Sequence, residues 1–481
     1  MVSNWQTISL KNRKRIKIIA SLFLAAALFL TGVTPSFADS KNTELKPSAK
    51  ISWDDAPAVE GTSAILMDAG SGEILYEKNS HEKRDPASVT KILTCLVVLE
   101  TMEIDQKVTS SVNFDPSTGG VGINIKKGEV FTVEQLLYAL MLPSANDAAE
   151  VLAIAAGGSI SNFCDMMNER AAMIGAEDTH FTNPNGLNGA GQENHRTTAY
   201  DLALIAREAM KNDQFRKIVS TVEYTIPATN MSDAREFINL NRCISDGETT
   251  LKNADKPTDS KSFRYEGTLG IKTGYTSTAG NCFCGWVQKD NTELVSVVLN
   301  SSTYKTRFSD SMSLWDYGFD KYYTYTAATA GDVLDEFRVK HGAKGEVSVT
   351  VGEDLDITLN KGYKSKGITT ELTPAARKIE APIKKGDEVG TITVFKDGKP
   401  VAEKSLYAGE KVEKGGILSY VGIPDEDVPK ALIGIAVVLI LLFVIYNLYR
   451  RYQYKQKKRT RARIGRDIRR KEWDKEKNPF D

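Results

Sequence analysis

Three short motifs whose residue types suit nucleophilic catalysis follow one another along the chain: Ser88-Val-Thr-Lys91, Ser144-Ala-Asn146 and Lys272-Thr-Gly274. In the first, the serine and the lysine are three positions apart at the start of a predicted helix, so both side chains lie on one face. A serine hydroxyl is a weak nucleophile until a neighbouring base removes its proton. A lysine amine can be that base only when its pKa falls well below about 10.4, which burial or a second cation achieves. We therefore predict Ser88 as the nucleophile and Lys91 as its base.

The other two motifs supply groups that a nucleophilic serine needs around it. Lys272 is a candidate second cation near Lys91, and on an edge strand it can offer its charge to a substrate carboxylate. Ser144 is expected to relay a proton toward the leaving amine, and the Asn146 amide to hold a substrate peptide. The strand around Lys272 can also pair with an extended peptide through its backbone.

Each motif alone has low specificity, because the same patterns recur in the chain. Ser302-Thr-Tyr-Lys305 also fits Ser-x-x-Lys, Ser111-Val-Asn113 also fits Ser-x-Asn, and a single Ser-x-x-Lys is more often a solvated helix face. Ser88 differs because it follows Pro86 at a predicted helix start, where backbone N–H groups can stabilise an oxyanion. Lys272-Thr-Gly274 occurs once in the chain. All three motifs in this order favour catalysis.

The segment that contains these motifs, residues 61–325, has the hydrophobic patterns of one α/β domain. Strands are predicted at both ends of the segment and helices between them, which favours one sheet over a series of βαβ units. The predicted strands are Ser63–Met67, Glu73–Glu77, Thr268–Lys272, Asn281–Val287 and Leu294–Leu299. The predicted helices are Ser88–Met102, Val133–Leu142, Asp147–Ala156, Thr198–Lys211 and one near Asp310–Tyr317.

Residues 332–424 have a different character. Apolar and polar residues alternate there, and Lys-Gly, Asp-Gly and Gly-Gly pairs separate the alternating runs. Alternation predicts strands and the glycine pairs predict turns, so we expect a small all-β domain. Its sequence shows no cluster of His, Cys or paired carboxylates, and we expect it to serve as a spacer.

The N-terminus carries the pattern of a secretory signal. Residues 1–38 contain a basic stretch, an uncharged apolar run from Ile18 to Val33, and small residues just before Asp39. This order predicts a signal peptide cleaved before Asp39, with an uncleaved anchor as the alternative. The polar residues 39–60 are expected to form a spacer.

A second uncharged run, residues 431–449, predicts a transmembrane helix. As a helix it spans about 28 Å, close to the roughly 30 Å hydrocarbon core of a bilayer. The basic tail that follows, residues 450–481, predicts a cytoplasmic C-terminus and an external segment 39–430. The tail also carries enough Lys and Arg to touch anionic lipid, although a topology signal alone is the simpler role.

The formal net charge of zero hides a strong asymmetry. The tail 450–481 has a net charge of +9 and residues 1–38 have +5, so the segment between them carries −14. An acidic middle between two basic ends excludes nucleic acid as the main partner of the folded part.

The cysteines predict neither a disulfide framework nor a metal site. Their number, five, is odd in a chain predicted to be exported. Cys282 and Cys284 alternate on a predicted strand, and their spacing is not the Cys-x-x-Cys of a zinc or redox site, so we expect buried small side chains. No His, Asp or Glu spacing suggests a metal site, and we expect no metal and no cofactor.

The chain resembles the D-alanyl-D-alanine carboxypeptidases, a family of low-molecular-weight penicillin-binding proteins, over about residues 60–420. The motif trio is the one found in penicillin-binding proteins and β-lactamases. The stretches that carry the resemblance are Pro86–Thr94, Leu142–Ala149, Phe181–Leu187 with His195, and Gly270–Thr276. The resemblance implies a penicillin-binding/β-lactamase-like catalytic domain, with a mostly antiparallel sheet and helices on both faces, followed by the all-β domain.

The resemblance also implies a reaction. Ser88 would be acylated by the penultimate D-Ala carbonyl of a peptidoglycan stem peptide ending in D-Ala-D-Ala, the terminal D-Ala would leave, and water would hydrolyse the acyl-enzyme. β-Lactams would acylate the same serine. The backbone N–H groups of Ser88 and Tyr275 would form the oxyanion hole, and Arg307 with Thr273 would hold the terminal carboxylate. The implied substrate-binding residues are Asn146, Lys272, Thr273, Gly274, Tyr275 and Arg307. For Arg307, a surface position at a helix start is the alternative.

Three other functions stay open at this point. A β-lactamase shares the motifs but needs a glutamate that activates water, and the sequence does not place one. A non-catalytic β-lactam sensor, signalling inward through the basic tail, predicts acylation by penicillin without D-Ala release. A Ser/His/Asp hydrolase has little support, because there is no Gly-x-Ser-x-Gly and His195 is expected to be structural. The full membrane span departs from the family pattern, which usually ends in an amphipathic helix lying on the membrane.

Overall fold

A computed structural model describes residues 55–115, 120–187, 194–244, 263–376 and 379–477. The predicted signal peptide, residues 1–38, and most of the predicted spacer, residues 39–60, lie outside the described residues.

The catalytic region is built on a five-stranded antiparallel sheet with the strand order β2-β1-β9-β8-β7. Its strands are β1 Ser63–Asp68, β2 Ile74–Lys78, β7 Thr268–Thr276, β8 Gly280–Lys289 and β9 Thr292–Ser301. Strand β1 pairs with β9, so the first and last parts of the domain meet in the centre of the sheet. Strand β7, which carries Lys272, is an edge strand as predicted.

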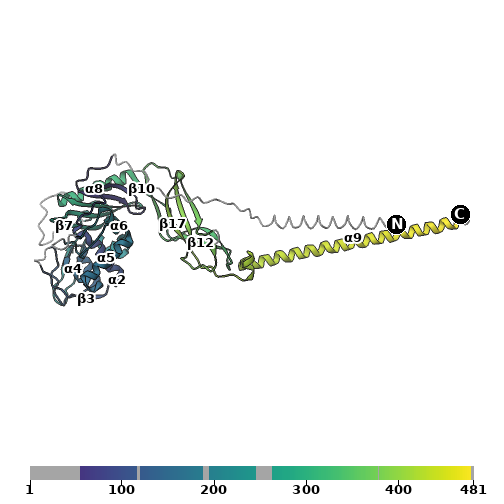
Figure 1. Ribbon diagram of the computed structural model, residues 1–481, viewed down its shortest axis with the longest axis horizontal. Helices are drawn as coiled ribbons and strands as arrows, with labels where there is room; N and C mark the ends of the chain where they lie inside the picture. Colours follow the sequence, from purple (N-terminus) through teal and green to yellow (C-terminus); the bar gives the residue numbers. More distant parts are fainter. Residues whose placement is uncertain (1–54, 116–119, 188–193, 245–262, 377–378, 478–481) are drawn as a thin grey trace. The chain divides into compact units, whose positions relative to one another are not determined.

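Helices cover both faces of this sheet (Figure 1). The helical segments are η1 Ala87–Thr90, α2 Lys91–Thr101, α3 Val133–Met141, α4 Asn146–Gly157, α5 Ile160–Ile174, α6 Ala199–Met210, α7 Asp213–Ser220 and α8 Tyr304–Lys321. Alternate residues of β1 face opposite ways: Ile65 packs in one core with residues of α2 to α7, and Leu66 packs in the other with residues of α8. The predicted α/β fold with helices on both faces is confirmed.

Several helix starts follow from local sequence. The Thr132 side chain accepts from the Gln135 N–H and the Gln135 side chain accepts from the Thr132 N–H, which caps α3 at its first turn. Pro143 then separates α3 from α4, because a proline has no N–H for the next helical hydrogen bond; Leu142 before it still has helical backbone angles. Thr198 caps α6 by accepting from the Asp201 N–H.

The structure differs from the sequence prediction in three places. Ser88 lies in the short 3₁₀ turn η1, and the α-helix begins only at Lys91. Helices α5 and α7 were not predicted, although the buried residues of α7, Phe215, Ile218 and Val219, have the i, i+3, i+4 spacing of an amphipathic helix. Two small hairpins were also missed: β3 Lys107–Thr109 with β4 Val130–Thr132, and β5 Glu223–Ile226 with β6 Arg235–Ile238.

The C-terminal domain is all-β, as predicted. Its strands are β10 Tyr322–Ala328, β11 Val333–Lys340, β12 Glu346–Val351, β13 Leu355–Asn360, β14 Ile368–Pro374, β15 Ile379–Glu380, β16 Glu388–Lys396 and β17 Lys399–Ala408. A six-stranded sheet has the order β14-β16-β17-β12-β11-β15, and β10 pairs separately with β13. The short turns η3 Ser365–Gly367, η4 Ile417–Val421 and η5 Asp425–Asp427 complete it.

The chain continues as one helix, α9, from Val428 to Lys477. Within the part of the chain that the structure describes, it is the one helix long and apolar enough to cross a membrane. It contains the whole predicted span, residues 431–449, and most of the predicted basic tail.

Candidate active site

Ser88 is half-buried on η1 and is approached closely by two other backbone segments. A Cβ atom on Gly274 would lie 3.0 Å from the Ser88 nitrogen, and a Cβ atom on Gly186 would lie 1.9 Å from the Ala87 oxygen. Ala87 itself has a φ of 50°, in the left-handed region. Glycines at 186 and 274 therefore let the turn before Leu187 and strand β7 pack against the peptide that joins Ala87 to Ser88.

Lys91 is fully buried and its amine lies between three oxygen atoms. The Lys91 Nζ donates to Asn146 Oδ1 at 2.7 Å and to the Asn185 carbonyl at 2.6 Å, and it lies 3.2 Å from Ser88 Oγ. Two of these partners are carbonyl oxygens, which only accept. A neutral amine has two N–H groups for them and one lone pair, and that lone pair is left for the Ser88 hydroxyl.

The electrostatics of Lys91 favour that neutral form. Burial, and after it the charge of Lys272, lower the pKa of Lys91 well below the ordinary 10.5. The carboxylates of Asp147 and Glu150 act in the opposite direction but do not outweigh burial. The expectation that burial and a second cation prepare Lys91 as a base agrees with this environment.

Two further cations lie beside the serine, and both are buried. Lys272 is on β7, and burial followed by the charge of Arg307 lowers its pKa to about 7. Arg307 is in the first turn of α8, where its Nη1 donates to the Gly274 carbonyl at 2.9 Å and burial lowers its pKa to about 10. The alternative of a surface residue is wrong for Arg307, because its side chain is buried. An anion placed beside these desolvated charges is stabilised.

The remaining predicted site residues lie on β7 and at the start of α4. Ser144 is buried with a φ of 67°, and its Oγ has no hydrogen-bond partner among the described residues. Asn146 begins α4, and its N–H donates to the Val121 carbonyl at 2.7 Å. On β7, Thr273 is buried, whereas Tyr275 is 64% exposed.

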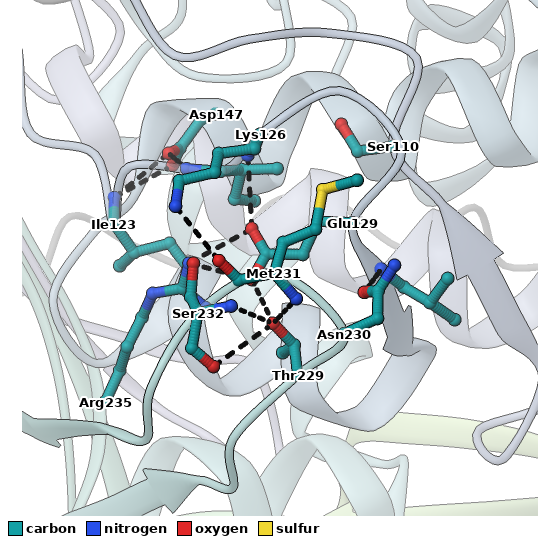
Figure 2. Close-up of polar contacts among 12 residues, drawn as sticks. Ser110, Ile123, Lys126, Glu129, Asp147, Thr229, Asn230, Met231, Ser232 and Arg235 are labelled. Atoms are coloured by element: carbon teal, nitrogen blue, oxygen red, sulfur yellow. Dashed lines mark hydrogen bonds and ion pairs between the residues drawn. The ribbon is translucent and has the colours of Figure 1, made fainter.

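A loop next to Asn146 is held in place by two buried carboxylates (Figure 2). Asp147 accepts from the Ile123 and Ile125 N–H groups, each at 3.0 Å. At the base of the loop, Glu129 accepts from Arg235 Nη2 at 2.9 Å and from the Thr229 hydroxyl. The loop that accepts the Asn146 N–H at Val121 is therefore held in part by the ion pair of Glu129 with Arg235.

We expect Glu129→Gln to lower the free energy of unfolding by about 3 kcal/mol at neutral pH, because it leaves the largely buried Arg235 guanidinium without its counter-ion. Burial raises the pKa of Glu129, but hydrogen bonds from Thr229, the Lys126 amide and Arg235 outweigh it, so this pKa lies below 4.5. A carboxyl whose pKa is lower in the folded than in the unfolded protein stabilises the fold at pH values above its unfolded-state pKa. That stabilisation is lost as the pH falls through the pKa of the folded state. Thermal unfolding in detergent at several pH values measures both effects.

The control for this prediction is Asp178→Asn. Asp178 pairs with Lys83 at 3.0 Å, but both side chains are more than 45% exposed. An exposed pair of this kind contributes at most about 1 kcal/mol. Equal destabilisation by the two variants, or a Glu129→Gln effect that grows in acid, would contradict the assignment.

His195 is completely buried, and both of its ring nitrogens are hydrogen-bonded. Nδ1 accepts from the Thr182 N–H at 3.0 Å and Nε2 lies 2.9 Å from Thr90 Oγ1. Burial lowers the pKa of His195 to about 3, so the ring is neutral. This geometry fits a structural residue and does not fit the base of a Ser/His/Asp hydrolase.

The competing motifs lie in other settings. Ser302 follows β9, and its hydroxyl bonds to the Glu60 carboxylate. Ser111 is exposed. Sequence reasoning missed the Asn185 carbonyl, because a backbone atom has no side-chain signature; only the turn-forming Asn-Pro-Asn-Gly run that contains it was visible.

The cysteines and possible metal ligands complete the inventory. All five cysteines are buried and free, and Cys282 and Cys284 lie in the same core. Burial raises the pKa of the Cys282 thiol to about 11. Across the described residues, no group of His, Cys, Asp or Glu side chains is arranged to hold a metal ion.

Comparison with known proteins assigns the family. Residues 50–303 match the family model described as D-alanyl-D-alanine carboxypeptidase, and residues 322–414 match the model of the penicillin-binding protein 5 C-terminal domain. The D-alanyl-D-alanine carboxypeptidase DacF of Bacillus subtilis (strain 168) is 31% identical over 413 residues, which cover 84% of this chain and 97% of that protein. DacC of Escherichia coli (strain K12) is 31% identical over 378 residues, covering 76% and 88%.

The fold is likewise similar to a solved structure. Penicillin-binding protein 5 from Haemophilus influenzae superposes with a TM-score of 0.57 at 27% identity, over 74% of this chain and 99% of that one. The likeness extends through both folded domains, as the two family matches do. This chain therefore belongs to the D-alanyl-D-alanine carboxypeptidase family of serine peptidases and is an enzyme of that type.

Proposed function

We propose that this enzyme removes the terminal D-alanine from peptidoglycan stem pentapeptides through an acyl-enzyme on Ser88. One observation carries the proposal: the Lys91 amine has both of its N–H groups engaged by carbonyl oxygens and its lone pair left for the Ser88 hydroxyl. Burial supplies the lowered pKa that a lysine base requires.

The reaction proceeds in two halves. Lys91 takes the proton of Ser88, and Oγ attacks the carbonyl carbon of the penultimate D-Ala. The N–H groups of Ser88 and Tyr275 stabilise the oxyanion. Ser144 passes its hydroxyl proton to the leaving amine and takes the proton held by Lys91, so D-Ala departs and Lys91 is neutral again. Water then adds to the ester while Lys91 takes a proton from it, and Lys91 returns that proton to the Ser88 oxygen as the shortened peptide leaves.

The proposed substrate contacts select a peptide with a free C-terminus. Lys272, Thr273 and Arg307 hold its terminal carboxylate, while Asn146 and the backbone of Gly274 hold the peptide itself. The buried charges of Lys272 and Arg307 support this assignment, because a carboxylate offsets the cost of their desolvation. A β-lactam also carries a carboxylate and would acylate Ser88 at the same position.

The test compares a pentapeptide ending in D-Ala-D-Ala with the same peptide ending in an amide. We expect the peptide with the free carboxylate to be cleaved and the amide to be turned over about 10²-fold more slowly. The ratio of the two rates should be smaller in Arg307→Met, because the carboxylate then loses a charge-assisted hydrogen bond. Turnover of both peptides is measured as the loss of pentapeptide by liquid chromatography, because the amide releases D-alaninamide and not D-Ala. Labelling by penicillin without any D-Ala release would replace this function by that of a β-lactam sensor.

We further propose that α9 anchors the enzyme in the cell membrane, with residues 1–38 removed as a signal peptide, the catalytic domain 61–325 and the all-β domain 332–424 outside, and the tail 450–481 in the cytoplasm. The cations Arg450 and Arg451 directly after the apolar run support this direction. External protease on intact cells should digest residues 39–430 and spare a tag at Asp481. Digestion of the tag with residues 39–430 protected would show the opposite topology.

A further inference from the structure

A chain of hydrogen bonds runs behind Ser88 and ends on the peptide that precedes it. The Thr182 N–H donates to His195 Nδ1 at 3.0 Å, and His195 Nε2 lies 2.9 Å from Thr90 Oγ1. Thr90 Oγ1 in turn donates to the Ala87 carbonyl at 2.9 Å. The two side chains in this series of hydrogen bonds, His195 and Thr90, are completely buried.

The direction of each bond follows from the first. Because a backbone N–H can only donate, Nδ1 of His195 carries no proton, and in a neutral ring the proton is then on Nε2. Nε2–H therefore donates to the Thr90 oxygen, and the Thr90 hydroxyl has its own proton free for the Ala87 carbonyl. A phenyl ring, Phe181, stacks on the imidazole with centroids 4.9 Å apart and holds its plane.

The Ala87 carbonyl, the last acceptor in this series of hydrogen bonds, determines the direction of the Ser88 N–H. The Ala87 carbonyl and the Ser88 N–H belong to one peptide unit, which is planar, so the direction of one fixes the direction of the other. This unit follows Ala87, whose φ of 50° is a conformation that residues other than glycine rarely adopt. The close approach of Gly186 to the Ala87 oxygen restricts the same peptide from another side.

We propose that Thr90 and His195 are positioning residues that aim the Ser88 N–H at the oxyanion by holding the Ala87 carbonyl. The inference rests on the proposed role of Ser88 as the acylated nucleophile. His195 acts here as a neutral donor that orients a hydroxyl, and it exchanges no proton with the substrate. Its contribution is therefore to the height of the acylation barrier and not to the binding of the carboxylate.

The experiment measures the acylation rate constant with a fluorescent penicillin by stopped flow, on the full-length enzyme in detergent. The amplitude of the reaction reports the fraction of folded sites, and the rate constant reports how well a folded site works. We expect Thr90→Val to lower the rate constant by about 10²-fold with the amplitude retained, because a misaimed donor loses much of its effect on the oxyanion. Thr90→Ser, which keeps the hydroxyl, should stay within about fivefold of the wild type.

Two variants of His195 extend the test. His195→Gln keeps an N–H where Nε2 lies and should retain most of the rate, whereas His195→Phe fills the space without a donor and should lose it. Because Thr90 and His195 act in series, the double variant Thr90→Val/His195→Phe should be no slower than Thr90→Val alone. Thr101→Val removes a hydroxyl bond to the Val97 carbonyl at the other end of α2 and should not change the rate constant.

The outcomes separate this inference from the proposed function. A Thr90→Val rate constant equal to that of the wild type, or losses that multiply in the double variant, would overturn the positioning role. If His195→Phe does not fold, the rate constants of Thr90→Val and Thr90→Ser still test the positioning role. Failure of the wild-type enzyme to acylate at all would instead overturn the role of Ser88, whatever the variants do.

Discussion

Replacing Ser88 by alanine is expected to abolish covalent labelling by penicillin and to lower D-Ala release by at least about 10³-fold. The loss is large because the covalent path disappears and no other hydroxyl lies beside the Lys91 amine among the contacts that the structure describes. The binding groups, Lys272 and Arg307 among them, stay in place, so the affinity for a peptide product should change little. Intact-protein mass spectrometry and the D-Ala assay measure the two effects together.

The chain provides a matched control for this prediction. Ser302 heads the second Ser-x-x-Lys pattern, but it bonds to Glu60 and follows strand β9. Ser302→Ala should therefore keep labelling and turnover. If Ser88→Ala still released D-Ala at a substantial fraction of the wild-type rate, the acyl-enzyme mechanism would be wrong.

Lys91→Met is expected to reduce acylation by about 10²- to 10⁴-fold, the range that a general base contributes. Methionine keeps much of the buried volume but has no lone pair of sufficient basicity, and it leaves Asn146 Oδ1 and the Asn185 carbonyl without their donor. The protein should still bind penicillin non-covalently, because the carboxylate contacts lie elsewhere. Stopped-flow labelling separates the slow chemical step from binding.

The pH profile gives the same prediction a second test. Acylation needs neutral Lys91, so its rate should rise with pH through the pKa of Lys91. That pKa lies well below 10.5, because burial and the charge of Lys272 lower it by more than Asp147 and Glu150 raise it. It should fall again once Lys272 loses its proton, since that cation serves the carboxylate. The result is a bell-shaped curve for acylation in wild-type enzyme.

Lys91→Met should lack the ascending limb of this profile. Lys305→Met, in the competing motif, should retain it. A Lys91→Met enzyme with the wild-type profile would assign the base to another group.

The three motifs could be recognised from the sequence because each places its chemistry in side chains at fixed spacings. The pairing of Ser88 with Lys91 needed only the geometry of one helical turn, which is local. The edge position of Lys272 was expected without such an argument, because it depends on the order of all five strands in the sheet.

Other parts of the site could not be found in this way. The Asn185 carbonyl meets Lys91 across 94 positions of the chain, and His195 meets Thr90 across 105. Contacts of this length depend on the packing of the whole domain, which periodicity does not encode. The 3₁₀ start of the Ser88 helix and the left-handed Ala87 are set by the same packing, since the glycines that approach them come from distant segments.

The most direct test of the central claim is peptide mapping of the enzyme after reaction with penicillin, carried out alongside D-Ala release by the same samples. The mechanism predicts one adduct per molecule, on the peptide that contains Ser88, and a loss of D-Ala release in proportion to the labelled fraction. An adduct on Ser302 or any other residue, or full D-Ala release from fully labelled enzyme, would contradict it.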